Sequence, residues 1–484
     1  MLSRKYLFEP IPNATLVWLR VAIGLLGGGD ILGNGIYYHW YKQEFDGFTF
    51  RYYAFEWVHP LPEPFFSLFF IVGFLLGLAV AVGWRFRLTA PLFALCFTYV
   101  FLLEKAHYLN HAYLFCWLAW LLAFTPAWRE WSLDVYKNPP LWSPVAPRWS
   151  VVLFASMMGI VYFFGGIAKL NADWLLHASP LHMWIKSRSD TPIIGPLLAL
   201  KPTAYLMAWG GFLLDTFIVL FLLHKRLRWW ALAAAVFFHA TNHIIFQIGI
   251  FPYLSLVLTS LFFEPDWPKK FVQWLGSYFR FVKKWQVAWQ ERVRTSAGAR
   301  LEASSQIGEI SYSGHSPFHG TTTNADAFVI ANAITKKWLV PSLVVLFSIH
   351  ISLPLRHHLF ASNVAWSEEG HRYSWRMMLR SKRGYGSFRI VNQTTGETSV
   401  IRPGEYLNRK QARKLYTHPD MILQYAHHLA DECEREGNTC AVYADIQVRL
   451  NNGKYGPYID PEVDLSQIEW SWVTTKPWVL KEKD

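Results

Sequence analysis

The sequence predicts a mainly α-helical membrane protein: a helical bundle of about nine spans, with a small external α+β domain at its C-terminus. Two observations support this fold class. Of the 484 residues 52% are hydrophobic and 17% aromatic, and they gather in repeated runs of roughly 17 to 22 residues, the length that a helix needs to cross a bilayer. Beyond residue 360 the composition changes to that of a soluble domain.

Apolar runs bounded by charged or proline-rich breaks define the expected spans. The first run, from about Leu16, follows a polar and charged segment, so we expect this span to act as its own targeting signal in place of a cleavable one. The nine spans lie near residues 15–35, 65–84, 88–106, 109–127, 149–169, 204–223, 229–246, 248–264 and 337–354. The first eight form the predicted transmembrane catalytic bundle, 1–264.

Basic residues indicate the cytoplasmic side, because cytoplasmic loops carry an excess of lysine and arginine. In this chain they precede the first span and follow the second, sixth and eighth, which are alternate loops. An odd number of spans then places the N-terminus inside and the chain beyond about Arg356 outside. The residues are Arg4, Lys5, Arg85, Arg87, Lys225, Arg226, Arg228, Lys269, Lys270, Lys283 and Lys284. Topology and anionic lipid thereby account for the net charge of +12, and nucleic acid is not an expected partner.

Residues 265–336 are expected to connect the eighth span to the ninth on the cytoplasmic side. Trp267 to Arg294 is basic and aromatic, which is typical of a helix lying in the membrane interface. The Ser, Gly and Thr-rich run from Thr295 to Asn324 predicts a flexible linker. The ninth span, 337–354, then leads to the external domain.

The external domain, 355–484, has the pattern of a small α+β fold. Ser387–Val391 and Thr398–Arg402 flank a run of turn residues, which predicts a hairpin. A helix is expected near Gln411–Glu436 and a strand over Ala441–Leu450. Cys433 and Cys440 are expected to form a disulfide if the domain lies in an oxidising compartment, with two free thiols as the alternative.

Unusual polar residues collect at one level of the predicted bundle. The outer ends of the third, fifth and seventh spans carry His111, Lys169 and His239, with Asn110 and Asn242 beside them. Polar side chains that face lipid are costly, so we expect these groups to converge on an internal cavity.

The types of these residues suit proton transfer. Desolvation favours the neutral form of a lysine, so the Lys169 amine can act as a base. Asparagine and neutral histidine can donate hydrogen bonds to a developing oxyanion. A substrate that reaches such a cavity from the membrane is a lipid. The alternative is a structural lysine whose ammonium extends to the headgroups.

Two histidine pairs, His107 with His111 and His239 with His243, have the i, i+4 spacing that places both rings on one helix face and suits a metal. The sequence has no fuller set of histidine boxes or carboxylates near them. We therefore expect histidines that are hydrogen-bonded inside the bundle, and no metal site.

Several strings resemble the vitamin K-dependent gamma-glutamyl carboxylases, whose membrane part is shared with the bacterial horizontally transferred transmembrane (HTTM) domains. The resemblance extends from about residue 15 to 478 with a gap in the linker, and the short chain is similar to bacterial members of the family. The strings are Phe101–Lys105 through Asn110 and His111, Gly166–Trp174, Phe238–Tyr253, Tyr373–Met378, Pro403 and Gly404, Asp420–Ala426, and Asp460–Asp464.

The resemblance implies a lyase with vitamin K hydroquinone, molecular oxygen and carbon dioxide as co-substrates. A base deprotonates the hydroquinone, oxygen adds, and the resulting alkoxide removes a γ-proton from a peptide glutamate, whose carbanion captures carbon dioxide. By position Lys169 resembles the hydroquinone base and His111 the histidine at the carbanion, with Asn110 and His239 supporting them. The expected substrate-binding residues are Tyr373, Trp375, Met377, Met378 and Asn242. The implied partners are a glutamate-containing peptide or protein, the lipid bilayer and a quinone reductase.

Two departures from the animal pattern leave alternatives open. His371 and Arg380 stand where animal members carry a tyrosine and a histidine that are associated with glutamate handling. The first alternative is therefore a quinone epoxidase without carboxylation. The second is a non-catalytic membrane protein that binds a lipid or quinone. The expected location is the bacterial inner membrane, with a periplasmic active site and external domain, or the endoplasmic reticulum membrane, with both lumenal.

Overall fold

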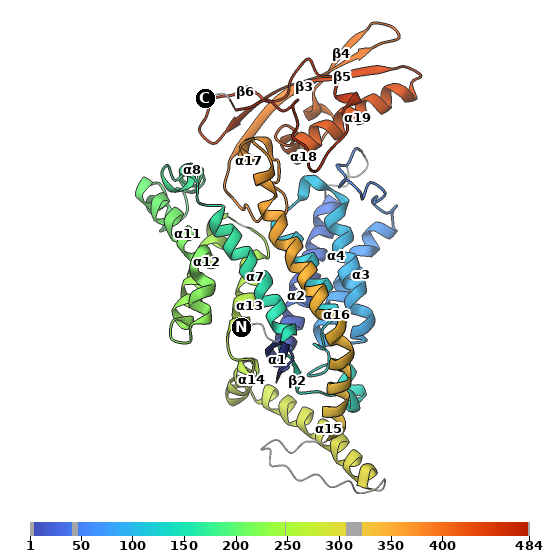
Figure 1. Cartoon of the computed structure of the whole chain (residues 1–484), viewed down its shortest axis with the longest axis vertical. Helices are drawn as coiled ribbons and strands as arrows, with labels where there is room; N and C mark the ends of the chain where they lie inside the picture. The colour runs from blue at the N-terminus through green and yellow to red at the C-terminus, as the bar shows by residue number, and fades with distance from the viewer. Residues whose placement is uncertain (1–3, 41–46, 247, 306–321, 483–484) are drawn as a thin grey trace.

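The structure, a computed structural model, describes residues 4–40, 47–246, 248–305 and 322–482. A helical bundle forms the centre of the molecule, the C-terminal domain covers one end, and α14 (Trp267–Tyr278) and α15 (Arg280–Ser305) lie at the other end (Figure 1). The bundle and the C-terminal domain each have their own buried core.

Seven helical stretches among the described residues are long and apolar enough to cross a membrane, which confirms a polytopic helical fold. Their side chains are apolar, and the helical conformation satisfies the backbone N–H and C=O groups within each segment, as a lipid environment requires. Six correspond to α2 (Ala14–Trp40), α3 (Phe65–Val82), α4 (Phe86–Leu103), α7 (Trp149–Ile167), α11 (Lys201–Leu223) and α12 (Arg228–Phe246), and the seventh, Lys337–Leu359, contains the end of α16 (Thr322–Leu355).

The other two predicted spans are shorter helices. The segment 109–127 forms α5 (Asn110–Ala123), and 248–264 forms α13 (Phe251–Thr259), which continues as a 3-10 helix to Phe262. At 1.5 Å per residue a helix of the length of α5 extends about 21 Å, less than the roughly 30 Å of a hydrocarbon core. The predicted span extended past this helix at its C-terminal end, where α5 stops at Ala123 and Pro126 follows.

Helices α7 and α11 pack closely at Gly166. A Cβ added to Gly166 would lie 2.4 Å from Thr216 Oγ1 and 2.7 Å from the Thr216 backbone nitrogen. The glycine therefore lets the two backbones approach, as small residues do where membrane helices meet. This contact fixes the end of α7 against the middle of α11.

Replacing Gly166 with alanine is expected to destabilise the protein by about 1 to 3 kcal/mol, because the backbone of Thr216 must shift to accept the methyl group. Gly210→Ala is the matched control, since nothing lies within 4 Å of a Cβ at that position of α11. Thermal unfolding in detergent measures both variants. Equal melting temperatures for the two variants would contradict the close contact.

The C-terminal domain contains a four-stranded sheet in the order β4-β3-β5-β6, with β3 (Lys382–Asn392), β4 (Thr398–Ile401), β5 (Cys440–Leu450) and β6 (Gly456–Pro457). Neighbouring strands are antiparallel, and Val391 pairs with Thr398 at the turn, which confirms the predicted hairpin. The predicted strand at Ala441 is also confirmed.

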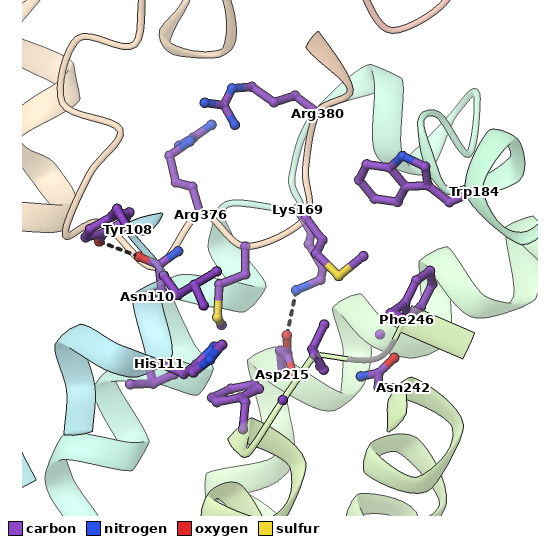
Figure 2. Close-up of a pocket in the computed structure, with 18 of the residues that line it drawn as sticks. Tyr108, Asn110, His111, Lys169, Trp184, Asp215, Asn242, Phe246, Arg376 and Arg380 are labelled. Atoms are coloured by element: carbon purple, nitrogen blue, oxygen red, sulfur yellow. Dashed lines mark hydrogen bonds and ion pairs between the residues drawn. The ribbon is translucent and has the colours of Figure 1, made fainter. Parts of the chain in front are cut away.

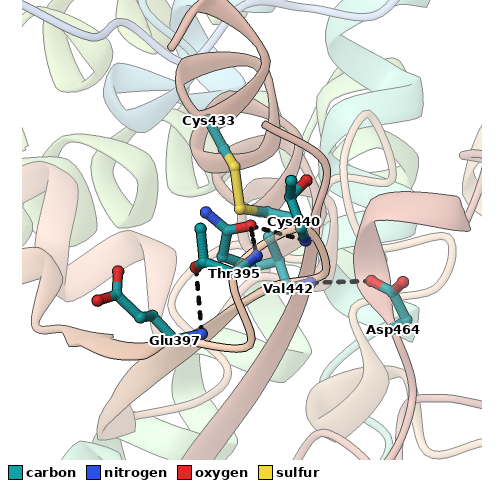
Figure 3. Close-up of a disulfide and its surroundings, with 8 residues drawn as sticks. Thr395, Glu397, Cys433, Cys440, Val442 and Asp464 are labelled. Atoms are coloured by element: carbon teal, nitrogen blue, oxygen red, sulfur yellow. Dashed lines mark hydrogen bonds between the residues drawn. A yellow bond between two sulfur atoms is a disulfide. The ribbon is translucent and has the colours of Figure 1, made fainter. Parts of the chain in front are cut away.

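The predicted helix near Gln411–Glu436 is two helices, α18 (Arg409–Leu415) and α19 (Pro419–Arg435). The break falls before Pro419, because a proline disfavours the helical conformation of the residue that precedes it. Cys433 near the end of α19 and Cys440 at the start of β5 form the expected disulfide (Figure 3).

Helices α14 and α15 cover the predicted interfacial segment Trp267–Arg294, with a break at Phe279. Helix α15 continues through residues 295–305, where a flexible linker was expected. Alanine, arginine and glutamate in this stretch favour a helix. The next part of the expected linker, 306–321, lies outside the described residues, and α16 begins at Thr322.

Candidate active site

A cavity of about 630 Å³ lies where the bundle meets the C-terminal domain. Its lining has two chemical parts, which we name the apolar wall and the basic wall. The apolar wall consists of Val161, Leu181, Trp184, Met207, Phe238, Phe246, Ile248 and Phe251, and the basic wall of Lys105, Arg372, Arg376, Arg380 and Lys414. Figure 2 shows Arg376 and Arg380 on one side of Lys169, with Asp215, Asn242 and Phe246 on the other.

Lys169 lies at the centre of the cavity, just beyond the end of α7. Its Nζ donates to Asp215 Oδ2 at 2.6 Å and to the Gly165 carbonyl at 2.9 Å (Figure 2). Both members of this pair have side chains that are only 8% exposed. A buried ion pair requires good geometry and further hydrogen bonds to offset its desolvation, and the Gly165 carbonyl supplies one of these.

Asp215 is a candidate site residue that the sequence analysis missed. It lies within α11, facing the end of α7. The available signal was its position as a lone carboxylate in the apolar run 204–223, because ionisable residues inside a membrane segment are functional candidates. The structure therefore gives Lys169 an anionic partner, where a lysine supported by histidine and asparagine was expected.

Asn110 and His111 begin α5 and line the cavity beside Lys169. The Tyr108 hydroxyl donates to Asn110 Oδ1 at 2.8 Å and accepts from the Tyr373 backbone N–H at 2.8 Å. Because the Asn110 carbonyl oxygen is engaged in this way, its amide nitrogen is directed to the cavity (Figure 2).

The His111 ring stacks on Phe251, with 5.8 Å between the ring centroids. The Gly249 backbone passes beside it, so a Cβ there would lie 3.7 Å from His111 Nε2. The ring faces the cavity and can offer a donor or an acceptor to a bound molecule.

His239 also lines the cavity and is almost fully buried in α12. Its Nε2 is 3.0 Å from the Tyr162 hydroxyl, which is 3.1 Å from Thr259 Oγ1. Its Nδ1 is buried and has no hydrogen-bond partner among the described residues. Asn242 follows one turn later and lines the cavity near Phe246 (Figure 2).

The two histidine pairs with i, i+4 spacing differ in structure. His107 ends a 3-10 helix and His111 begins α5, so the expected common helix face does not form. His239 and His243 share α12, but they contact different tyrosines, Tyr162 and Tyr253. Within the described part of the chain, no group of three or more His, Cys, Asp or Glu side chains is arranged to hold a metal ion.

The loop Glu368–Met378, which we name the insertion loop, extends from the C-terminal domain into the bundle. Its Met377 and Met378, which the sequence analysis expected to bind substrate, line the cavity. The Met377 methyl group would lie 3.7 Å from a Cβ on Gly165, close to the Lys169–Asp215 pair. The insertion loop therefore forms part of the wall beside the buried ion pair.

Tyr373 and Trp375 were expected to bind substrate, but neither lines the cavity. Trp375 is 1% exposed and packs on Tyr113 in the bundle core, with 5.6 Å between ring centroids. Tyr373 donates its backbone N–H to Tyr108, which orients Asn110. Both residues have positive φ angles, 64° and 57°, a conformation that persists in side-chain-bearing residues only when the surroundings impose it. Their observed contacts hold the insertion loop in place.

Buried ion clusters hold the C-terminal domain on the bundle. Asp420 pairs with Lys105 at 2.7 Å and with Arg372. Burial alone would raise the pKa of Asp420, but Arg372 and Lys105 outweigh it and hold that pKa well below its usual range. One carboxylate therefore connects the bundle to the insertion loop.

The two departures from the animal pattern, His371 and Arg380, gather at a second buried carboxylate, Glu368. Arg380 Nε donates to Glu368 Oε1 at 2.8 Å, and His371 Nε2 lies 4.0 Å from Oε2. Burial opposes ionisation of Glu368, but Arg380 and Lys382 outweigh it and keep its pKa well below the usual range. Arg380 is thus neutralised within the domain, whereas Arg376 has no ion pair with a described carboxylate.

Acid is expected to weaken this junction. A carboxyl group whose pKa is depressed by folding contributes stability above its unfolded pKa, about 3.9 for aspartate, and that contribution is lost as the pH falls further. Asp420→Asn should therefore lower the melting temperature at pH 7 and by a smaller amount near pH 3, because there the folded carboxyl stays ionised while the unfolded one is mostly protonated. Tryptophan fluorescence during heating measures both. An unchanged melting temperature at pH 7 would show that the cluster contributes nothing.

Both parts of the chain that build the cavity match known protein families. Residues 8–267 match the HTTM domain, and residues 335–484 match the lumenal domain of vitamin K-dependent gamma-carboxylase. No solved structure gave a significant match to the chain. The bundle with Lys169, and the C-terminal domain with the insertion loop, thus correspond to the two domains of one kind of protein. The chain belongs to the vitamin K-dependent gamma-carboxylase family.

Proposed function

We propose that this multi-pass membrane protein oxygenates reduced vitamin K to its epoxide and couples that reaction to γ-carboxylation of peptide glutamate. The observation that carries the proposal is one cavity in which a buried Lys169–Asp215 pair lies between an apolar wall and a basic wall. An apolar quinone and an anionic glutamate side chain need these two environments side by side.

The apolar wall suits the fused rings of a naphthoquinone, with Trp184 and Phe246 as aromatic partners. When bound, the hydroquinone supplies with molecular oxygen the strong base that the weakly acidic γ-proton of glutamate requires. The 2.6 Å contact between Lys169 Nζ and Asp215 Oδ2 lets a proton move from the lysine to the carboxylate. When that proton is on Asp215, the Lys169 amine can accept a proton from a hydroxyl group in the cavity.

The basic wall suits carboxylates. Arg376 and Lys414 line the cavity without an ion pair to a described carboxylate, and guanidinium groups bind carboxylates through two parallel hydrogen bonds. Asn110 directs its amide nitrogen to the cavity, and His111 offers its ring there. These groups can stabilise negative charge that develops on a glutamate side chain. Epoxidation alone would leave Arg376 and Lys414 without an anionic partner in the cavity.

The arrangement of the molecule supports an external active site. The C-terminal domain and the basic helices α14 and α15 lie at opposite ends of the bundle (Figure 1), and the positive-inside rule assigns the basic end to the cytoplasm. The cavity is then periplasmic in a bacterial inner membrane or lumenal in an endoplasmic reticulum membrane. We propose a separate quinone reductase as the source of the hydroquinone.

The test is to incubate the purified protein in neutral-lipid nanodiscs with vitamin K hydroquinone, a glutamate peptide and labelled carbon dioxide, and to measure epoxide and incorporated label. Both products, each dependent on Lys169, support the proposal. Epoxide without label identifies an epoxidase. Absence of both products, with hydroquinone bound, identifies a binding protein and overturns the proposal.

A further inference from the structure

A second cavity, of about 780 Å³, lies along the first half of β3. We name it the basic groove. It is lined by Arg383, Gly384 and Tyr385 of β3, by Asn408, Arg409, Lys410 and Arg413 around α18, and by Tyr37 and Tyr455. Its four basic residues come from two separate elements, and its described lining contains no aspartate or glutamate.

The three arginines of the groove are not balanced by carboxylates in the described part of the chain. Arg383, Arg409 and Arg413 form no ion pair with a carboxylate in the described part of the chain. Arg383 lies directly opposite Arg449 in the β3–β5 pairing, and like charges opposite each other destabilise a sheet. Arg449 Nε is buried and has no hydrogen-bond partner among the described residues. An anion in the groove would relieve this repulsion.

An open strand edge favours a peptide as the occupant. Strand β4 pairs only with Phe388–Val391, so the half of β3 from Lys382 to Ser387 has a strand neighbour, β5, on one side only. Alternate residues of an antiparallel strand direct their N–H and C=O groups to each side. An extended peptide can bond to such an edge while basic side chains beside it bind carboxylates.

The groove lies close to the reaction cavity. Lys410 and Arg413 line the groove, whereas Lys414 on the same helix lines the cavity. Residues 410 and 414 are about one helical turn, 5.4 Å, apart along the axis. A chain held in the groove can therefore continue past Lys414 toward Lys169.

We infer that the basic groove is a docking site for an acidic, extended segment of the peptide substrate, next to the glutamate that enters the cavity. This inference rests on the proposed carboxylation for the identity of the substrate, but the binding itself does not need turnover. The groove adds a preference for peptides with several carboxylates near the reacting residue.

The experiment measures equilibrium binding of a fluorescent peptide of alternating glutamate and glycine to the full chain in phosphatidylcholine nanodiscs, without hydroquinone. The double variant Arg409→Gln/Arg413→Gln is expected to bind about tenfold more weakly, because two attractive charges are lost from the rim. The matched control, Arg389→Gln/Arg402→Gln, removes the same charge from exposed positions of the same domain outside the groove lining and should bind within about twofold of the unmodified protein. A peptide with glutamine in place of glutamate should bind poorly.

Three results would overturn the inference. They are equal binding by the two double variants, no preference for glutamate over glutamine, and binding of phosphatidylglycerol but not of the peptide, which would identify a lipid site. If the Arg409→Gln/Arg413→Gln protein carboxylates the acidic peptide with an unchanged KM, the groove does not bind the substrate. The proposed function would then remain intact. Groove-dependent binding without carbon dioxide uptake would refute the proposed function alone.

Discussion

Replacing Lys169 with arginine is expected to lower epoxide formation at least about 100-fold while the protein remains folded. A positioned general base typically contributes 10² to 10⁴ in rate, and a guanidinium stays protonated under conditions where an amine can lose its proton. The arginine can still pair with Asp215, so the buried carboxylate keeps a cationic partner. Chromatographic measurement of epoxide from the hydroquinone gives the result.

Thermal unfolding is the control, because removal of one partner of a buried pair otherwise costs about 3 to 5 kcal/mol. Asp215→Asn, which removes the second site for the shared proton, should also reduce epoxide formation. Near-normal turnover by a folded Lys169→Arg protein would exclude Lys169 as the base. Loss of activity in Asp215→Asn alone would assign the proton acceptor to the carboxylate.

Replacing His111 with alanine is expected to lower carbon dioxide incorporation about 100-fold and to change epoxide formation far less. Loss of one aimed hydrogen-bonding group typically costs 10² to 10³ in the step that it serves. His111 lines the cavity and stacks on Phe251, whereas the buried Lys169–Asp215 pair lies between the end of α7 and α11. Parallel assays of epoxide and incorporated label on the same samples separate the two half-reactions.

His243→Ala is the matched control for His111→Ala. His243 lies on α12, contacts Tyr253 and is not part of the cavity lining. Its loss should leave both activities close to those of the unmodified protein. Equal loss of epoxide and label in His111→Ala would mean that quinone and glutamate chemistry share this histidine.

The sequence predicted those parts of the fold that depend on local pattern. Apolar runs located the helices, and turn residues at 392–397 located the hairpin, because each pattern reflects contacts within a short stretch of chain. The length of the helix from Asn110 was overestimated at its C-terminal end, because the apolar run continues past Ala123 whereas the helix stops before Pro126. The break before Pro419 was missed, although a proline was present to indicate it.

The candidate site was predicted in part. Lys169, His111, Asn110, His239 and Asn242 line one cavity, because the ends of alternate spans meet at one level of a bundle. Asp215 was missed, since its role depends on a contact between residues 46 positions apart. Tyr373 and Trp375 belong to a sequence motif that resembles the carboxylase family. A motif does not show which of its side chains face a cavity and which pack behind it.

The insertion loop also determines when the site can exist during synthesis. Lys169 and Asp215 are synthesised early, whereas Met377 and Arg376 belong to a domain that is translated last. An incomplete chain therefore contains the Lys169–Asp215 pair without the wall that encloses it. The cavity is completed only when the final domain has folded and docked, so an unfinished protein leaves the Lys169–Asp215 pair open to water and lipid.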